Sequence, residues 1–168
     1  MLTPLVAGLF ALAGVTLGVF LEPVKARVAA RTRLREDRAL RCAQLVEAAT
    51  TANGAIVWLL GTIRQATPPL AASDITIAEV EQRYWDARND LKKAVLLIRL
   101  IGPNELVSSA VEVGDSDLEL RRLWFDREPA GRESDSVEMS RALHANTRAL
   151  DEFADLARRL TAPSRNYR

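Results

Sequence analysis

From Leu2 to Leu21 the chain forms an unbroken apolar segment without an ionisable side chain, in which Thr3 and Thr16 carry the only polar groups. At about 1.5 Å rise per residue, a helix of this length spans roughly 30 Å, the thickness of the hydrocarbon core of a bilayer. A helix buried in a soluble protein would normally show a polar stripe. The pattern therefore predicts a transmembrane anchor over residues 1–23.

A cluster of basic residues follows the apolar segment, and no Lys or Arg precedes it. A secretory signal peptide has the opposite order, so an uncleaved anchor is the better interpretation. Lys and Arg beside a span stay on the cytoplasmic side. The sequence thus predicts a protein of the inner cell membrane, with its N-terminus outside and its body in the cytoplasm. We also expect the cluster to contact anionic lipid headgroups; it comprises Lys25, Arg27, Arg31, Arg33, Arg35, Arg38 and Arg41.

Small residues recur at helical spacing within the apolar segment: Ala7, Ala11, Gly14 and Gly18. Two helices in lipid associate through close backbone packing, which such a face permits. We expect this face to pack against the span of a second copy or of a different membrane protein.

The pattern after the anchor changes from charged to periodically apolar. Residues 24–38 carry few apolar side chains and predict a charged connector helix, and Pro23, between the span and this helix, is a place where the chain would kink. From Cys42 to Ile63, a mainly apolar set of residues that includes Asn53 and Leu60 recurs every three or four positions, as on one buried helix face. The stretch "TPPLAAS" ends this helix, because paired prolines cannot continue it. The connector and this helix are compatible with one continuous helix.

The next predicted helix opens at Thr76, which together with Glu79 has the spacing of a capping box. It ends at "IGPN", where Gly102 suits a left-handed position after a helix and Pro103 prevents continuation. Its apolar face includes Tyr84 and Leu91.

Two more helices are predicted, over Asn104 to Asp126 and from Ser136 to about residue 162. The first is only loosely periodic, with Val113, Leu118 and Arg121 among the positions of its expected buried face, and Gly114 is a place where it would divide. Residues 163–168 are expected to form a disordered tail. No strand-like alternation occurs, and helices of similar length with short connections favour antiparallel packing. The predicted fold is all-α, with one N-terminal transmembrane helix followed by a cytoplasmic antiparallel four-helix bundle over residues 39–162.

Charge is distributed unevenly along the chain. Residues 1–41 have a balance of +4, whereas residues 42–168 have a balance of −3. A body that bound nucleic acid would concentrate positive charge on one face, so no nucleic-acid partner is expected. The single cysteine, Cys42, allows no intramolecular disulfide, in keeping with a reducing cytoplasm.

The residues that carry chemistry are sparse. A di-iron bundle needs Glu-x-x-His motifs, but the residue three positions before the only histidine, His144, is Arg141. There is no nucleophile elbow and no phosphate-binding glycine loop. Asp151 and Asp155 read as a solvated pair rather than a cation site. We therefore expect no enzyme activity, no cofactor and no metal.

Several isolated residues favour structural roles. Cys42 and the polar Asn146 occupy core-like positions, where Asn146 would set the register of the helices. The three tryptophans, Trp58, Trp85 and Trp124, read as core anchors.

The sequence favours a non-enzymatic single-pass membrane protein whose cytoplasmic bundle acts as a scaffold, adaptor or regulatory subunit. Two alternatives remain open: phosphotransfer or enzymatic chemistry at His144, and a membrane-active protein of the pore-forming or lysis type.

Overall fold

The computed structural model describes the backbone of residues 3–63, 76–126 and 136–162, and the side chains of residues 22–61, 76–126 and 137–162. These residues form four helices and no strand. The helices are α1 (Thr3–Ile63), α2 (Ile77–Ile101), α3 (Asn104–Phe125) and α4 (Ser136–Thr161). The chain divides into two compact units, Met1–Asp37 and Arg38–Arg168. The prediction of an all-α fold with four helices is confirmed.

Helix α1 is continuous over 61 residues and belongs to both units. Pro23 lies inside it and does not end it. The connector predicted for residues 24–38 and the first bundle helix are thus one helix. In the first unit, all the side chains from Glu22 to Asp37 are exposed.

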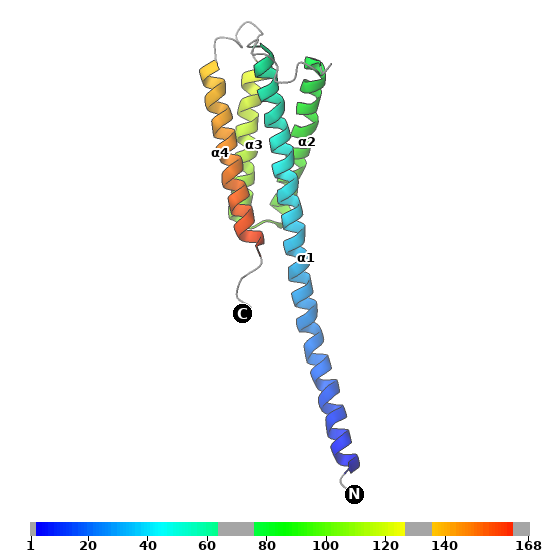
Figure 1. Cartoon of the computed structure of the whole chain (residues 1–168). Coiled ribbons are helices and arrows are strands. Elements are labelled where there is room, and N and C mark those ends of the chain that lie inside the picture. Colours follow the sequence, from blue (N-terminus) through cyan, green and yellow to red (C-terminus); the bar gives the residue numbers. More distant parts are fainter. Residues whose placement is uncertain (1–2, 64–75, 127–135, 163–168) are drawn as a thin grey trace. The chain divides into compact units, whose positions relative to one another are not determined.

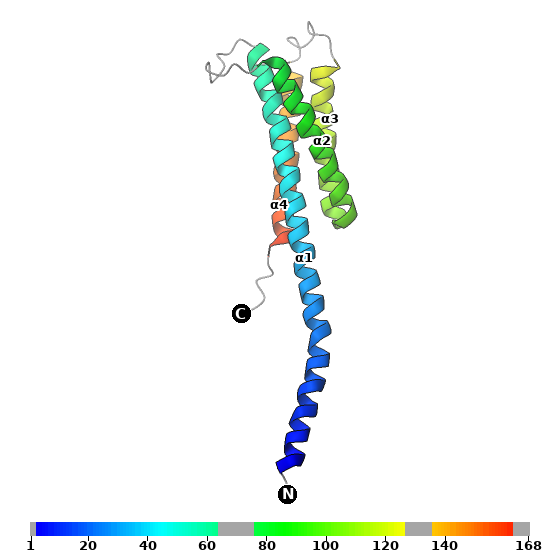
Figure 2. The ribbon, with the colours of Figure 1, turned by 90° about the vertical axis from the view of Figure 1, so that its right-hand side faces the viewer.

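The second unit is a bundle of four antiparallel helix segments (Figures 1 and 2). The part of α1 from Arg38 onward runs in one direction, α2 returns, α3 runs parallel to α1, and α4 returns beside α3. The turn between α2 and α3, near Gly102, consequently lies at the end of the bundle that contains Arg38. A hydrogen bond of 2.8 Å from Arg38 Nε to the Ile101 carbonyl oxygen joins the two segments there.

Side chains from all four helices fill the core, which has two clusters. The cluster nearer to Arg38 contains Leu45, Leu91, Ile98, Leu106 and Phe153 among others. The other contains Ile56, Leu59, Tyr84, Leu120, Trp124 and Met139. On α1 the buried positions continue as Ala52, Ile56 and Leu59, so that Asn53 and Leu60, which the sequence pattern placed on this face, lie half-buried at its side.

The beginning of α2 agrees with the sequence. Thr76 has extended backbone angles, and its hydroxyl accepts a hydrogen bond of 3.3 Å from the Glu79 N–H. The Glu79 carboxylate in return accepts one of 2.7 Å from the Thr76 N–H. These two bonds form the predicted capping box, and they hold the pKa of Glu79 below 4.5.

The end of α2 differs from the prediction. Gly102 is not left-handed but extended, with φ −84° and ψ 152°. Pro103 explains this, because the residue before a proline is forced away from helical angles. Glycine is nevertheless required, since a Cβ on Gly102 would lie 2.7 Å from the Ile98 carbonyl oxygen. The same oxygen accepts a hydrogen bond of 2.7 Å from the Gly102 N–H.

The expected division of the third helix at Gly114 does not occur, and α3 is continuous from Asn104 to Phe125. Gly114 faces α2, where a Cβ would lie 3.9 Å from Val95 Cγ2, an ordinary contact distance. The residue therefore costs α3 some intrinsic stability without interrupting it.

Within the part of the chain whose side chains are described, no helix is long and apolar enough to cross a membrane. The transmembrane helix predicted from Leu2 to Leu21 has its side chains outside that part, so it gains no support from the structure. The predicted disordered tail, residues 163–168, also lies outside the described residues.

We predict that Thr76→Ala lowers the free energy of unfolding by about 1 kcal/mol, because it removes the oxygen that caps the Glu79 N–H. Thr76→Ser keeps that oxygen and should behave like the native chain.

The bonds of the capping box lower the pKa of Glu79, so their stabilisation is present at neutral pH and is lost as pH falls below 4.5. Of the bonds to the Glu79 carboxylate, Thr76→Ala removes only the 3.1 Å bond from the Thr76 hydroxyl, whereas the bond from the Thr76 N–H remains. Denaturation followed by circular dichroism at pH 7 and pH 3 should therefore show the difference between the native chain and Thr76→Ala shrinking in part at pH 3.

Candidate functional site

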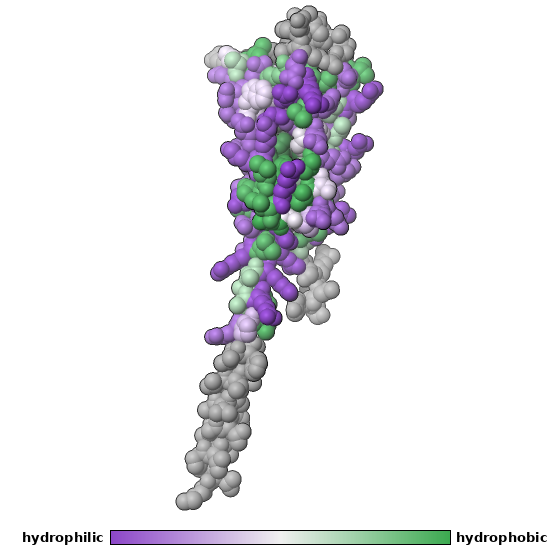
Figure 3. Space-filling model, turned by 180° about the vertical axis from the view of Figure 1, so that it is seen from behind, coloured by the Kyte–Doolittle hydropathy of each residue, from purple (hydrophilic) through white to green (hydrophobic). Residues whose placement is uncertain are grey.

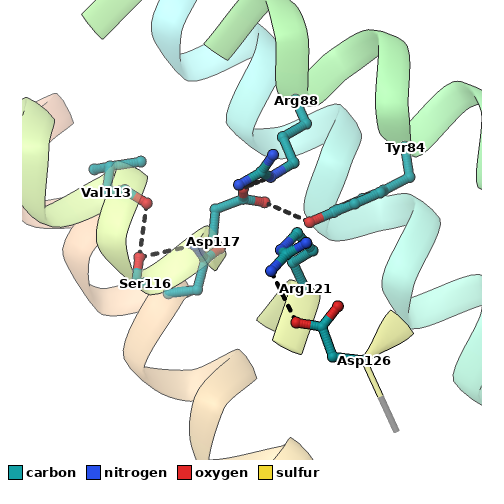
Figure 4. A network of polar contacts seen from close by, with 8 residues as sticks. Tyr84, Arg88, Val113, Ser116, Asp117, Arg121 and Asp126 are labelled. Carbon is teal, nitrogen blue, oxygen red and sulfur yellow. Dashed lines mark hydrogen bonds and ion pairs between the residues drawn. The ribbon is translucent and has the colours of Figure 1, made fainter. Parts of the chain in front are cut away.

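The most distinctive chemical feature of the bundle is a buried group of polar side chains between α2 and α3 (Figure 4). Asp117 of α3 accepts a hydrogen bond of 3.1 Å from Arg88 Nε through Oδ2, and one of 3.3 Å from the Tyr84 hydroxyl through Oδ1. All three residues are buried, Tyr84 completely. Both oxygens of the carboxylate are therefore engaged by α2, and the two helices are joined by one charged and one neutral donor.

Burial governs the electrostatics of this group. It raises the pKa of Asp117 above 3.8, a rise that the positive charge of Arg88 and the bond from Tyr84 oppose. Burial and the nearby Asp117 carboxylate also raise the pKa of Tyr84. The Tyr84 hydroxyl consequently keeps its proton at neutral pH and acts as a donor to Asp117.

Aromatic rings surround the donors at one side of the group. The Tyr84 ring stacks on Phe125 with 5.0 Å between centroids, and Trp85 lies 4.9 Å from Phe125. The Arg88 guanidinium carbon lies 5.8 Å from the Trp85 ring centroid, within the range of a cation–π contact. These rings exclude water from the ion pair and fill the space beside it.

A second polar contact joins α3 to α4. Asn146, buried as its core-like position predicted, donates a hydrogen bond of 2.9 Å from Nδ2 to Ser116 Oγ. Ser116 in turn donates to the Val113 carbonyl oxygen of its own helix at 2.9 Å. Since Ser116 and Asp117 are consecutive, α3 is held to both neighbouring helices at one level of the bundle.

This arrangement is suited to positioning helices rather than to catalysis. Arg88 and Asp117 are more than nine-tenths buried, and each is already paired with the other, so neither is presented to a substrate. Among the described residues, no group of three or more His, Cys, Asp or Glu side chains is placed to hold a metal ion. Asp155 forms an exposed ion pair with Arg158 at 2.8 Å.

The sequence interpretation missed the ion pair. It placed Leu118 and Arg121 on the buried face of α3, but Asp117 is buried there and both predicted residues are half-buried. A signal was present, because Asp117 follows Val113 by four residues and precedes Leu120 by three. A charged residue in that register, with Arg88 four residues after Tyr84 on α2, indicates a buried pair.

His144 and Cys42 occupy contrasting environments. The His144 side chain is exposed, and its Nδ1 atom lies 2.7 Å from the Ser140 carbonyl oxygen. A carbonyl can only accept, so Nδ1 carries a proton and Nε2 of the neutral ring is an acceptor. Cys42 lies in the core, where burial raises the pKa of its thiol and so suppresses the reactive thiolate.

The predicted lipid-contacting residues fall into two groups. Five of them have exposed side chains in the first unit: Lys25, Arg27, Arg31, Arg33 and Arg35. Arg38 and Arg41 are half-buried in the second unit. Arg38 donates to the last carbonyl of α2, where a positive charge is favourable, and Arg41 donates to Gln44 at 3.1 Å. The predicted packing face, with Ala7, Ala11, Gly14 and Gly18, lies outside the described side chains.

Two surface clefts of the bundle carry charges of both signs. A cleft of about 640 Å³ between α1 and α2 is lined by acidic side chains, such as Glu47 and Asp86, and by basic ones, such as Arg41 and Arg83. A second cleft, between α3 and α4, is likewise mixed. Neither gathers the single charge sign that a phosphate or a metal ion would require.

The chain matches no known protein family, no curated protein sequence and no solved structure.

We predict that Asp117→Leu lowers the free energy of unfolding by about 3–5 kcal/mol, because it leaves the Arg88 charge buried without its partner. The double variant Arg88→Met and Asp117→Leu should be much more stable than Asp117→Leu alone, since the unpaired charge is then gone. Urea denaturation of the native chain, of Asp117→Leu, of Arg88→Met and of the double variant measures the coupling free energy between the two residues. Simple addition of the two single effects would show that Arg88 and Asp117 are not energetically paired.

Proposed function

We propose that the chain is a non-enzymatic, single-pass protein of the inner cell membrane, which presents its helical bundle in the cytoplasm as a scaffold, adaptor or regulatory subunit. One observation carries the proposal: a charge-free segment from Leu2 to Leu21 is followed directly by a cluster of seven basic residues. Such an order anchors a helix in a bilayer and retains the residues after it in the cytoplasm.

The proposed role of the connector follows from its charge. Its five exposed cations, from Lys25 to Arg35, follow the proposed membrane span closely in the sequence. Each cation near an anionic bilayer contributes about 1 kcal/mol of attraction. We therefore assign them to contacts with anionic headgroups. Arg38 is bound to the end of α2 and has a structural role as well.

The described interior of the bundle supports a role in holding other proteins. The polar groups at its centre are paired with one another, as Arg88 with Asp117 and Asn146 with Ser116. They support a fixed arrangement of helices, which a scaffold or adaptor requires. In this proposal the outer faces of the helices, rather than an interior pocket, would bind the partner.

A second candidate function is phosphotransfer at His144. It draws on one observation: the imidazole is exposed and its Nδ1 proton is directed to the Ser140 carbonyl, which leaves Nε2 as the nucleophilic nitrogen. Phosphorylation of the purified chain that disappears on His144→Ala would favour this candidate over the scaffold.

We predict that the full chain stays in the membrane pellet after an alkaline carbonate wash, whereas a chain without residues 1–23 leaves it. A reporter active only in the cytoplasm should function when fused after Arg168. If the shortened chain also resists the wash, the segment from Leu2 to Leu21 is not the anchor. Activity of a reporter that works only outside the cytoplasm would reverse the proposed orientation.

We further predict that the connector contributes charge-dependent affinity for lipid. A peptide covering Val24 to Arg41 should bind vesicles containing anionic lipid more tightly than neutral vesicles, and added salt should weaken the binding. The same peptide with Arg31, Arg33 and Arg35 replaced by Gln is the matched control and should lose most of the difference. Equal binding to both kinds of vesicle would leave the cations with a topological role only.

A further inference from the structure

The outer surfaces of α2 and α3 both carry apolar side chains that take no part in the two core clusters. Leu96 is 57% exposed and Leu100 is 79% exposed, four residues apart on one side of α2. On α3, Val111 and Leu118 are half-buried and belong to neither of the two core clusters. Figure 3 shows apolar side chains gathered among polar ones in the lower half of the bundle, on the side that α3 occupies. We call these four residues and the charges beside them the α2–α3 face.

The contact between Gly114 and Val95 sets which of these residues lie at the same level. The two helices are antiparallel, and these two positions are adjacent across the seam. Counting three residues from each places Val111 at the level of Ile98, between Leu96 and Leu100. The apolar side chains of α2 and α3 are thus at matching heights along the bundle.

Leaving aside Arg122, which lies four residues after Leu118 and pairs with Glu119 of its own helix at 3.6 Å, the charges on the α2–α3 face have opposite signs on the two helices. Lys92 lies four residues before Leu96 and Arg99 three residues after it, so both share its side of α2. Asp115 lies four residues after Val111 and three before Leu118, on their side of α3. Within the described residues, neither Arg99 nor Asp115 forms an ion pair. One helix therefore offers leucines with cations, and the other offers apolar side chains with a carboxylate.

A second copy of the same chain fits this pattern in one orientation. If a two-fold axis runs parallel to the helices, α2 of each copy faces α3 of the other, at the same height. Leu96 and Leu100 then meet Val111, and Asp115, at the level of Ala94, lies between the levels of Lys92 and Arg99 of the other copy. An axis perpendicular to the helices would instead place Lys92 and Arg99 against their own copies, which like charges disfavour. We propose that two chains dimerise through the α2–α3 face about an axis parallel to the bundle.

This dimer is independent of the proposed membrane anchor but compatible with it. An axis parallel to the bundle directs the Arg38 ends of both copies to the same side. Two chains anchored in one membrane from the same side can adopt that arrangement, and chains without an anchor can adopt it equally.

Disulfide crosslinking in the full chain tests the proposal. Two differently tagged copies are co-expressed in a Cys42→Ala background, one carrying Leu96→Cys and the other Val111→Cys. Oxidation should give a disulfide dimer that contains both tags. The matched control pairs Leu96→Cys with Val137→Cys, which is 71% exposed on α4, and should give none.

Two results would overturn the proposal. One is the absence of the mixed dimer from a chain that circular dichroism shows to be folded. Pairing through the membrane spans alone would also give no mixed dimer. The other is a disulfide dimer of Leu96→Cys with itself in preference to the mixed one, which would place α2 against α2.

The charges provide a second test with its own rescue. Asp115→Arg should weaken dimerisation about tenfold, because it places cations of both copies together. Combining it with Arg99→Asp restores opposite signs and should recover most of the affinity. Sedimentation of the full chain at several concentrations measures both changes. Unchanged association of Asp115→Arg would exclude the proposed contact between Arg99 and Asp115.

Discussion

Arg88 Nε of α2 and Asp117 Oδ2 of α3 lie 3.1 Å apart in the interior of the bundle, and this pair restricts how α2 and α3 can shift against each other. Two buried charges tolerate little displacement, because separating them leaves each without solvent and without a partner. Tyr84 occupies the second carboxylate oxygen, so the register of α2 against α3 is set by two donors rather than one. The adjacent bond between Ser116 and Asn146 extends the same constraint to α4.

The α2–α3 register has consequences at the surface. It places Val111 at the height of Leu96 and Leu100, and it places Asp115 at a height between Lys92 and Arg99. A shift of α3 by one residue would rotate Asp117 out of the core and remove the match between the two helices. The interior ion pair and the proposed dimer face are therefore linked through the same helix positions, although they share no side chain.

Helix α1 combines two different environments without a break. In the bundle, the inward face of α1 is apolar and includes Cys42, Leu45 and Ala49. Arg38, four residues before Cys42, lies on the same face of the helix. Arg38 still serves the bundle, because it binds the last carbonyl of α2, but the side chains before it are exposed. The change from apolar to basic residues on one face marks the position at which helix packing ends.

The sequence alone determined the class of fold, the number and approximate bounds of the bundle helices and the capping box at Thr76. These follow from local periodicity, proline positions and side chains three residues apart. It did not reveal that Asp117, rather than Leu118, is buried, nor that Gly102 is extended. Both depend on tertiary structure: the Arg88 and Tyr84 donors that make burial of a carboxylate tolerable come from another helix, and the close carbonyl of Ile98 together with Pro103 decides the backbone at Gly102. The matched charges of the α2–α3 face likewise exist only once two helices are aligned, because their residues are far too distant along the chain for a local pattern to relate them.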